Sequence, residues 1–279
     1  MKIIESWQEV QALSLKWKKE GLKVAFVPTM GALHEGHLTL LREGKRLGDK
    51  LILSIYVNPK QFGPNEDLSK YPRTKEADFK LAEDCNVDVI FYPSDKAIYP
   101  DGYQTNIEVT ETTKGLCGEK RPGHFRGVTT VVLKLFNIVQ PDVAIFGEKD
   151  FQQLVVIKTM VRDLNLPIKI VGLPTVRGPD GLAMSSRNRY LSKDERQAAL
   201  SISKSLQVAK EMVKSGEADF AKIIAAVTKT INSTNLLKID YIKICDPETL
   251  VELTKIKPSA RILIAAFAGK TRLIDNYEL

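Results

Sequence analysis

Two histidines three residues apart, His34 and His37, stand in the segment KVAFVPTMGALHEGH, residues 23–37. Their spacing predicts that both rings lie on one face of a helix that opens after the turn at Gly31. The unpaired N–H groups and positive dipole at the start of a helix favour a phosphate ligand. Imidazole N–H groups can donate hydrogen bonds to the same oxygens. The segment therefore predicts a phosphate site, where Gly36 leaves room for the ligand.

Two other interpretations of the histidine pair stay open. A zinc site would need three or four ligands, whereas the remaining histidine, His124, is far along the chain and the three cysteines stand alone. Both histidines could instead simply pack. The glycine-rich turn around them favours the phosphate site.

Lys149 lies in the segment GEKDFQQ, residues 147–153, between a predicted strand and a predicted helix. A cation just before a helix N-terminus is unfavourable unless an anion lies between them, so Lys149 points to a bound phosphate. Asp150 and Gln153 have a structural alternative, because they can form a capping box at the start of that helix.

Two further polar segments could contact a ligand. Ser185, Ser186 and Arg187 could surround polyphosphate oxygens, the arginine with two parallel hydrogen bonds. The alternative for that segment is a solvated loop. Gln61 follows a predicted strand and could bind a substrate that carries a hydroxyl and a carboxylate. A turn formed by Asn58-Pro59 with Gln61 in solvent is an equal alternative.

The segment RPGHFRG, residues 121–127, precedes a predicted helix and could be a lid or basic rim, or a structural loop. Other motifs are excluded. Gly269-Lys270-Thr271 resembles the end of a P-loop, but the first glycine of that motif would fall on Ile264. A G-x-G-x-x-G segment after the first strand and a G-x-S-x-G elbow are both absent from the sequence, which argues against nicotinamide and serine-hydrolase chemistry.

The elements that must position these residues alternate along the first part of the chain. Continuous apolar strands between amphipathic helices predict an α/β fold whose parallel sheet has helices on both faces. In such sheets, ligands bind beyond the carboxyl ends of the strands, where these motifs fall. Strands are predicted at 24–27, 50–57, 87–92, 142–146 and 168–172, and helices at 36–47, 74–85, 128–139 and 150–164.

The pattern changes after Pro174. Residues 176–189 are polar and predict a mobile loop, and Ser192 with Glu195 predicts a capping box that starts a helix to about residue 214. A helix at 220–231 and strands at 238–244, 261–267 and 273–276 complete a smaller α+β domain. We therefore expect two domains, 1–175 and 176–279.

The 279 residues are 27% charged and 43% hydrophobic, with a net charge of +7. The basic residues are scattered, which suits anionic small molecules and gives no reason to expect nucleic acid. Residues 1–21 predict an amphipathic helix rather than a signal peptide, and no segment is long enough to cross a membrane. Three separated cysteines favour a reducing compartment, so we expect the cytoplasm.

Two of these segments, His34–His37 and Met184–Arg187, resemble the paired HxGH and KMSKS-like motifs of the nucleotidyltransferase superfamily. Within it, segments along nearly the whole chain resemble the pantothenate synthetase (pantoate–β-alanine ligase) family. The matching segments are, in the order of that family, residues 27–37, 57–62, 71–74, 121–125, 146–153 and 182–188.

The resemblance implies a Rossmann-like fold and a two-step reaction with ATP and Mg²⁺. The carboxylate of (R)-pantoate attacks the α-phosphorus of ATP, and β-alanine then attacks the pantoyl adenylate to give pantothenate and AMP. The positions implied to bind ATP are Met30, Gly31, His34, His37, Gly147, Lys149, Asp150, Val176, Met184, Ser185, Ser186 and Arg187.

The resemblance also assigns roles at the reacting centre. His37 is the implied proton donor, and His34, Lys149 and Arg187 supply the other donors and positive charges that catalysis at phosphorus needs. Gln61 and Gln153 are implied to bind pantoate, with Gln61 also facing β-alanine. Asp78 is implied to help hold magnesium.

The family further suggests a homodimer through the first domain. An adenylate must be protected from water, so we expect the loop with Ser185 to Arg187 to close over ATP with the second domain. Three rivals remain: another adenylyltransferase, which would keep AMP in its product; a fragment of an aminoacyl-tRNA synthetase; and a binding protein that has lost activity.

Overall fold

The computed structural model describes residues 1–254, 257 and 259–279. These residues form two compact units. The first comprises Met1–Glu148 and Val156–Pro174, and the second Lys149–Val155 and Thr175–Leu279. The boundary expected at residue 175 thus lies beside an observed junction, but Lys149–Val155 also belongs to the second unit, which the sequence did not indicate.

The first unit contains a six-stranded parallel sheet in the order β1-β4-β3-β2-β5-β6. The expected parallel sheet is therefore confirmed. The direction of strand succession reverses between β2 and β5, so the carboxyl ends of these two strands flank a topological switch point, where ligands of such sheets bind. The strands are β1 (Lys2–Ile4), β2 (Val24–Thr29), β3 (Lys50–Ile55), β4 (Val89–Phe91), β5 (Val143–Gly147) and β6 (Lys169–Leu173).

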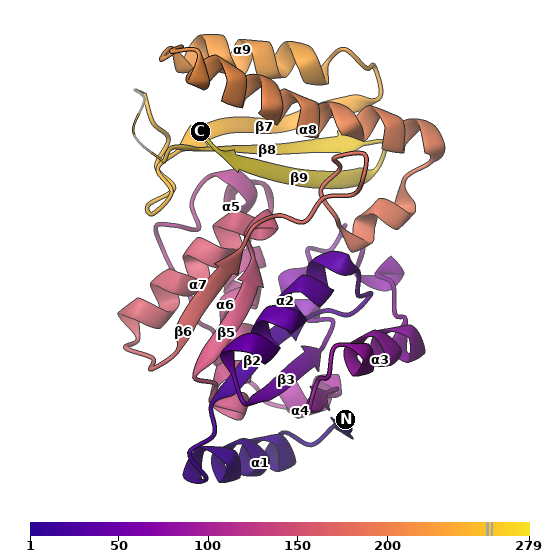
Figure 1. Ribbon diagram of the computed structural model, residues 1–279, viewed down its shortest axis with the longest axis vertical. Helices are drawn as coiled ribbons and strands as arrows, with labels where there is room; N and C mark the ends of the chain where they lie inside the picture. Colours follow the sequence, from indigo (N-terminus) through magenta and orange to yellow (C-terminus); the bar gives the residue numbers. More distant parts are fainter. Residues whose placement is uncertain (255–256, 258) are drawn as a thin grey trace. The chain divides into compact units, whose positions relative to one another are not determined.

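Helices cover both faces of this sheet (Figure 1). On one face, Val27 and Leu53 pack with Leu41 of α2 and Ala82 of α3 in one buried cluster. On the other, Phe26 meets Phe136 of α6 edge to face, with ring centroids 6.4 Å apart. Alternate residues of each strand therefore enter opposite layers. The helices are α1 (Trp7–Lys19), α2 (Glu35–Leu47), α3 (Lys75–Asp84), α4 (Asp95–Ile98), α5 (Leu116–Lys120), α6 (His124–Val139) and α7 (Phe151–Asp163).

Two predictions for this unit were wrong at element ends. Lys2–Ile4 is a strand that pairs with β4, Ile3 opposite Ile90, rather than the start of an amphipathic helix. Three residues are too few to show a period, so pairing with the existing sheet decides their conformation. The helix expected from Val128 begins at His124, after Gly123 in the left-handed conformation.

The second unit contains the antiparallel sheet β7-β8-β9, which confirms the expected smaller α+β fold. Helices α8 (Lys193–Lys214) and α9 (Phe220–Ile231) cover one face, where Ile223 and Val227 pack with Ile262 and Ile264 (Figure 1). The strands are β7 (Leu237–Cys245), β8 (Arg261–Ala268) and β9 (Thr271–Glu278).

The predicted capping box at the start of α8 is confirmed. The Ser192 hydroxyl accepts from the Glu195 N–H at 3.2 Å, and the Glu195 carboxylate accepts from the Ser192 N–H at 2.8 Å. The loop expected at 176–189 contains ordered pairing: Arg177 bridges Ala183 in antiparallel fashion, and a 3-10 helix spans Ser186–Tyr190.

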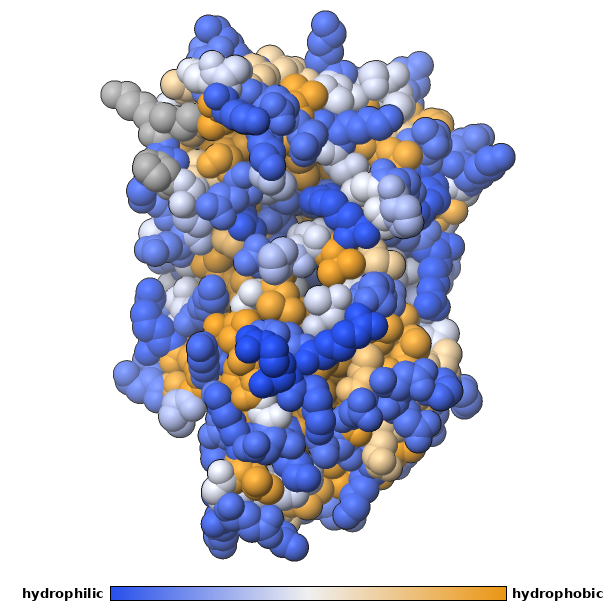
Figure 2. All heavy atoms as spheres, viewed as in Figure 1, coloured by the Kyte–Doolittle hydropathy of each residue, from blue (hydrophilic) through white to orange (hydrophobic). Residues whose placement is uncertain are grey.

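Hydrophilic side chains dominate the face in Figure 2, with smaller hydrophobic groups between them. In the described part of the chain, no helix has the length and apolar character required to cross a membrane.

Candidate active site

The turn after β2 is held by Asp78, which reaches it from α3. Asp78 is 2% exposed, and its carboxylate accepts hydrogen bonds from the N–H groups of Ala32, at 2.9 Å, and Leu33, at 2.8 Å. The Thr74 hydroxyl donates to the same carboxylate at 3.1 Å. Asp78 therefore fixes the backbone that leads into the histidine pair.

Gly31 is required at this turn on two grounds. Its φ is +80°, a backbone conformation that residues other than glycine rarely adopt. A Cβ atom here would lie 3.0 Å from both Asp78 Oδ2 and Ile55 Cγ2. The glycine thus lets the chain turn against the buried carboxylate.

The two histidines lie at the start of α2, although not both within it. The helix begins at Glu35, so His34 is its N-cap residue and His37 stands in its first turn. The rings are stacked at a tilt of 37°, with centroids 4.1 Å apart. The His34 N–H donates to Nδ1 of His37 at 3.3 Å. In the neutral ring the proton of His37 is then on Nε2, which makes Nε2 the donor.

Gln61 is 9% exposed, so the solvated alternative is excluded. It ends a 3-10 helix, Pro59–Gln61, whose N-cap is Asn58. The Asn58 amide donates to Gln61 Oε1 at 3.1 Å, while Gln61 Nε2 lies 3.1 Å from the sulfur of Met30. Gln61 and Met30, two predicted site residues from separate loops, are therefore in contact.

Residues 121–127, predicted to be a lid, a basic rim or a structural loop, contact neighbouring parts of the protein through Arg121 and His124. Arg121 binds the Glu66 carboxylate with two hydrogen bonds, at 2.7 and 2.6 Å. The His124 ring donates from Nδ1 to the main-chain oxygen of Gln61 at 2.8 Å, with Nε2 3.0 Å from Arg121. These contacts favour the structural loop, which holds the backbone of Gln61.

The pKa of Glu66 depends on its contact with Arg121. Burial opposes its charge, but the hydrogen bonds and positive charge of Arg121 outweigh burial and lower the pKa of Glu66 below 4.5. The carboxylate is therefore ionised at neutral pH, and the charge of Arg121 is balanced locally rather than offered to an acidic substrate.

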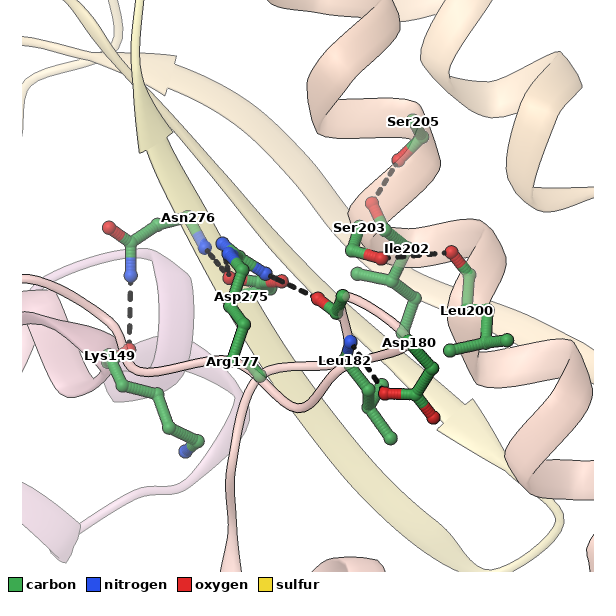
Figure 3. Close-up of polar contacts among 12 residues, drawn as sticks. Lys149, Arg177, Asp180, Leu182, Leu200, Ile202, Ser203, Ser205, Asp275 and Asn276 are labelled. Atoms are coloured by element: carbon green, nitrogen blue, oxygen red, sulfur yellow. Dashed lines mark hydrogen bonds and ion pairs between the residues drawn. The ribbon is translucent and has the colours of Figure 1, made fainter. Parts of the chain in front are cut away.

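Gly147 ends β5, and the chain continues through a 3-10 turn, Glu148–Asp150, into α7. Lys149 thus precedes the N-terminus of α7, as predicted. Its side chain is 19% exposed, with Nζ 3.7 Å from the Asp150 carboxylate. The Lys149 carbonyl accepts a hydrogen bond from the Asn276 amide at 3.0 Å (Figure 3), so the backbone is fixed independently of the side chain.

The loop with Met184 to Arg187 is anchored at its base. Arg177 binds Asp275 of β9 with two hydrogen bonds, at 2.7 and 2.9 Å (Figure 3). It also donates to the Gly181 carbonyl at 3.2 Å. The Met184 N–H donates to the carbonyl of Val176 at 2.9 Å. These pairs place Val176 and Met184, both predicted to bind ATP, side by side.

Ser185 and Ser186 begin the 3-10 helix after this turn. The Ser185 hydroxyl accepts from the Arg187 N–H at 3.3 Å, and Ser186 is 7% exposed. The alternative of a solvated loop for this segment is thus replaced by a 3-10 turn with defined hydrogen bonds. Sequence reasoning missed Arg177 and Asp275, because a charged pair 98 residues apart leaves no local signal.

The residues that the structure describes do not build a magnesium site by themselves. Among the residues that the structure describes, no group of three histidine, cysteine, aspartate or glutamate side chains could hold a metal ion. Asp78 uses both carboxylate oxygens for the turn after β2. Its predicted magnesium contact stays a prediction, whereas its hydrogen bonds give it a positioning role.

The sequence matches the family model "Pantoate-beta-alanine ligase" over residues 2–278. The pantothenate synthetase of Sulfurihydrogenibium sp. is 55% identical, with 100% of both chains covered. That of Syntrophus aciditrophicus is 54% identical over 99% of this chain and 97% of the relative.

Solved structures agree with the sequence relatives. The crystal structure of pantothenate synthetase from Thermus thermophilus superposes with a TM-score of 0.94 at 41% identity, covering 100% of this chain and 99% of the other. A pantoate-beta-alanine ligase from Francisella tularensis, complexed with beta-gamma ATP and beta-alanine, gives a TM-score of 0.84 at 39% identity, covering 100% and 97%. The chain therefore belongs to the pantoate-beta-alanine ligase family and is an enzyme of that family.

Proposed function

We propose that this chain carries out the reaction of its family with the residues described above. In the first step, a carboxylate oxygen of (R)-pantoate forms a bond to the α-phosphorus of ATP, and the bond to pyrophosphate breaks. In the second, the amine of β-alanine forms a bond to the acyl carbon, the acyl–oxygen bond to AMP breaks, and the amine loses a proton. One observation carries the assignment: the His34–His37 turn and the Lys149 segment follow the two strands that flank the switch point.

His37 is the proposed proton donor to the α-phosphate. Its Nδ1 accepts the His34 N–H, which supports Nε2–H as the donating group. His34, Lys149 and Arg187 add donors and positive charge as negative charge moves onto the phosphate oxygens. These groups need only to be held in the right positions, because attack at phosphorus requires no covalent enzyme intermediate.

ATP is the proposed ligand of the residues that the family resemblance implies. They are Met30, Gly31, His34, His37, Gly147, Lys149, Asp150, Val176, Met184, Ser185, Ser186 and Arg187. The anchored turn that begins at Val176 and ends at Arg187 supports this role, because Arg177–Asp275 and Met184–Val176 pairing pre-forms its backbone. Contact of this turn with ATP would then help to exclude water from the adenylate.

Pantoate is the proposed ligand of Gln61 and Gln153, with β-alanine next to Gln61. The burial of Gln61 and the weak acceptor that its amide nitrogen has in Met30 support a role as a fixed donor to a small polar substrate. Magnesium would enter with the triphosphate, which carries most of its ligands in such sites, with Asp78 as the only protein carboxylate assigned to it. When bound, the ion would neutralise phosphate charge.

The proposed assembly is a homodimer through the first unit, and the proposed compartment is the cytoplasm. Family resemblance supports the first, and the three buried cysteines Cys85, Cys117 and Cys245, widely separated in the sequence, are in keeping with a reducing compartment. Sedimentation equilibrium would test this assembly, and we expect the mass of two chains. The mass of a single chain at micromolar concentration would contradict the dimer.

An AMP-release assay separates this function from its rivals. The purified chain is supplied with ATP, magnesium, pantoate and β-alanine, and each is omitted in turn. We expect AMP only with all four present. AMP retained in a nucleotide-linked product would indicate another adenylyltransferase. Release stimulated by transfer RNA would indicate a synthetase fragment, and nucleotide binding without turnover an inactive relative.

A further inference from the structure

The hydroxyl of Tyr99 lies outside the residues assigned to the site, yet it is bonded to a residue that holds one of them. It donates to Asn58 Oδ1 at 2.9 Å, across 41 residues of sequence. Tyr99 follows α4, and its ring lies over the Lys60 ammonium, 4.5 Å from the centroid. Asn58 is 1% exposed, so its amide must find all its partners within the protein.

The Asn58 amide has a full set of partners in only one orientation. Oδ1 accepts from the Tyr99 hydroxyl and from the Lys60 N–H at 3.3 Å. Nδ2 donates to the Gly127 carbonyl and to Gln61 Oε1, both at 3.1 Å. A flipped amide would set an N–H group against the Lys60 N–H and an oxygen against the Gly127 carbonyl. The amide direction is thus fixed on both sides.

This direction is transmitted to Gln61. Because Asn58 Nδ2 binds Gln61 Oε1, the Gln61 amide turns its Nε2 toward Met30, whose sulfur is a weak acceptor. An amide nitrogen with only a weak partner is ready to donate to an oxygen of a ligand. The network therefore makes Gln61 an N–H donor toward substrate.

We propose that Tyr99 is a positioning residue that, through Asn58, holds the Gln61 amide as a hydrogen-bond donor to pantoate. This inference rests on the proposed function of Gln61. The Tyr99 hydroxyl is protonated, and so can donate, at neutral pH. Burial, with smaller effects of Tyr103 and Asp95, raises the pKa of Tyr99 above its usual value, so the hydroxyl keeps its proton.

The packing around Gly127 gives this network its rigidity. A Cβ at Gly127 would lie 2.2 Å from the Lys60 carbonyl and 2.7 Å from Gln61 Cα, so the glycine lets α6 press directly on the Gln61 loop. Loss of the Tyr99 hydroxyl leaves this backbone contact intact and removes one partner from Asn58. The expected effect is therefore confined to the two amides.

Tyr99→Phe tests the proposal, because it removes only the hydroxyl and keeps the ring over Lys60. We expect KM for pantoate to rise about threefold to tenfold, the range for one neutral hydrogen bond. KM for ATP should stay within about twofold, because the network touches no ATP residue except Met30. Equal changes in both KM values, or no change in either, would overturn the proposal.

Tyr103→Phe is the matched control. The ring of Tyr103 lies 5.0 Å from that of Tyr99 and over the same lysine, outside the chain of bonds from Tyr99 to Gln61. We expect wild-type KM values for this variant. A rise in pantoate KM as large as that of Tyr99→Phe would show that the aromatic cluster, rather than the hydroxyl, matters.

A double-mutant cycle with Gln61→Ala shows whether Tyr99 acts through Gln61. In the Gln61→Ala background, Tyr99→Phe should have no further effect on pantoate KM. Additive effects would overturn the proposal. If Gln61→Ala alone leaves pantoate KM unchanged, the proposed function of Gln61 fails instead, so the two failures are distinguishable.

Discussion

Nδ1 of His37 accepts the backbone N–H of His34 at 3.3 Å, and the two rings stack with centroids 4.1 Å apart. Nδ1 of His37 therefore caps the N-terminus of the helix, whereas Nε2 is the nitrogen proposed to donate a proton in the reaction. Any substitution at His37 changes both roles unless it is chosen to separate them.

His37→Asn and His37→Gln separate these roles. Asparagine places a polar atom near the position of Nδ1, and glutamine places one near Nε2. We expect His37→Asn to keep the melting temperature and to lower kcat by about 10² to 10³, as for loss of one donor to a developing oxyanion. His37→Gln should retain more activity. The reverse order of activities, measured by AMP release, would show that capping is the main role.

Gly31→Ala should destabilise the turn after β2 beyond the effect of backbone strain alone. The added Cβ would contact Asp78 and Ile55 at 3.0 Å, and φ is +80°. Gly21→Ala is the control, because Gly21 has φ +77° and nothing within 4 Å of such a Cβ. Strain alone costs about 1–2 kcal/mol. Urea unfolding should give a larger loss for Gly31→Ala, together with a higher KM for ATP; equal losses would contradict the role of Asp78.

Gln153→Ala should raise KM for pantoate roughly tenfold, as expected when a hydrogen bond to a charged group is lost. Gln153 stands in the first turn of α7, which begins at Phe151, so it could instead cap that helix. A lower melting temperature with unchanged pantoate KM would establish the capping role and remove Gln153 from the site.

Glu66 makes a pH-dependent contribution to stability. Because Arg121 lowers its pKa below 4.5, the contribution is complete above pH 4.5 and is lost as pH falls through the folded-state pKa. We expect Glu66→Gln to be less stable than wild type by on the order of 1 kcal/mol at neutral pH, since the pair is partly exposed. Urea unfolding should show the difference shrinking in acid. A difference independent of pH would contradict the ion pair.

The sequence was sufficient for the parts of the fold and the candidate site that depend on neighbouring residues. The strand before Gly31, the helix after His34 and the Ser192 capping box are local patterns, and the structure contains all three. The contacts of Asp78 with Ala32 and Leu33 span 46 and 45 residues. Such contacts exist only once the sheet brings α3 beside the turn, so local pattern cannot reveal them.

The same limit explains the loop from Val176 to Arg187. Its polar composition predicts a mobile segment, whereas the Arg177–Asp275 pair gives it a fixed base. Lys2–Ile4 likewise becomes a strand only because β4 offers an edge. In each case a partner distant in sequence overrides the local preference.

We propose above all that pantoate attacks the α-phosphorus of ATP before β-alanine takes part, with Lys149 among the stabilising charges. Exchange of labelled pyrophosphate into ATP measures this first step directly. We expect exchange that requires pantoate and proceeds without β-alanine, and a decrease of more than about tenfold in Lys149→Ala, whose backbone bond to Asn276 is retained. Exchange that needs β-alanine, or that is unchanged in folded Lys149→Ala, would contradict the claim.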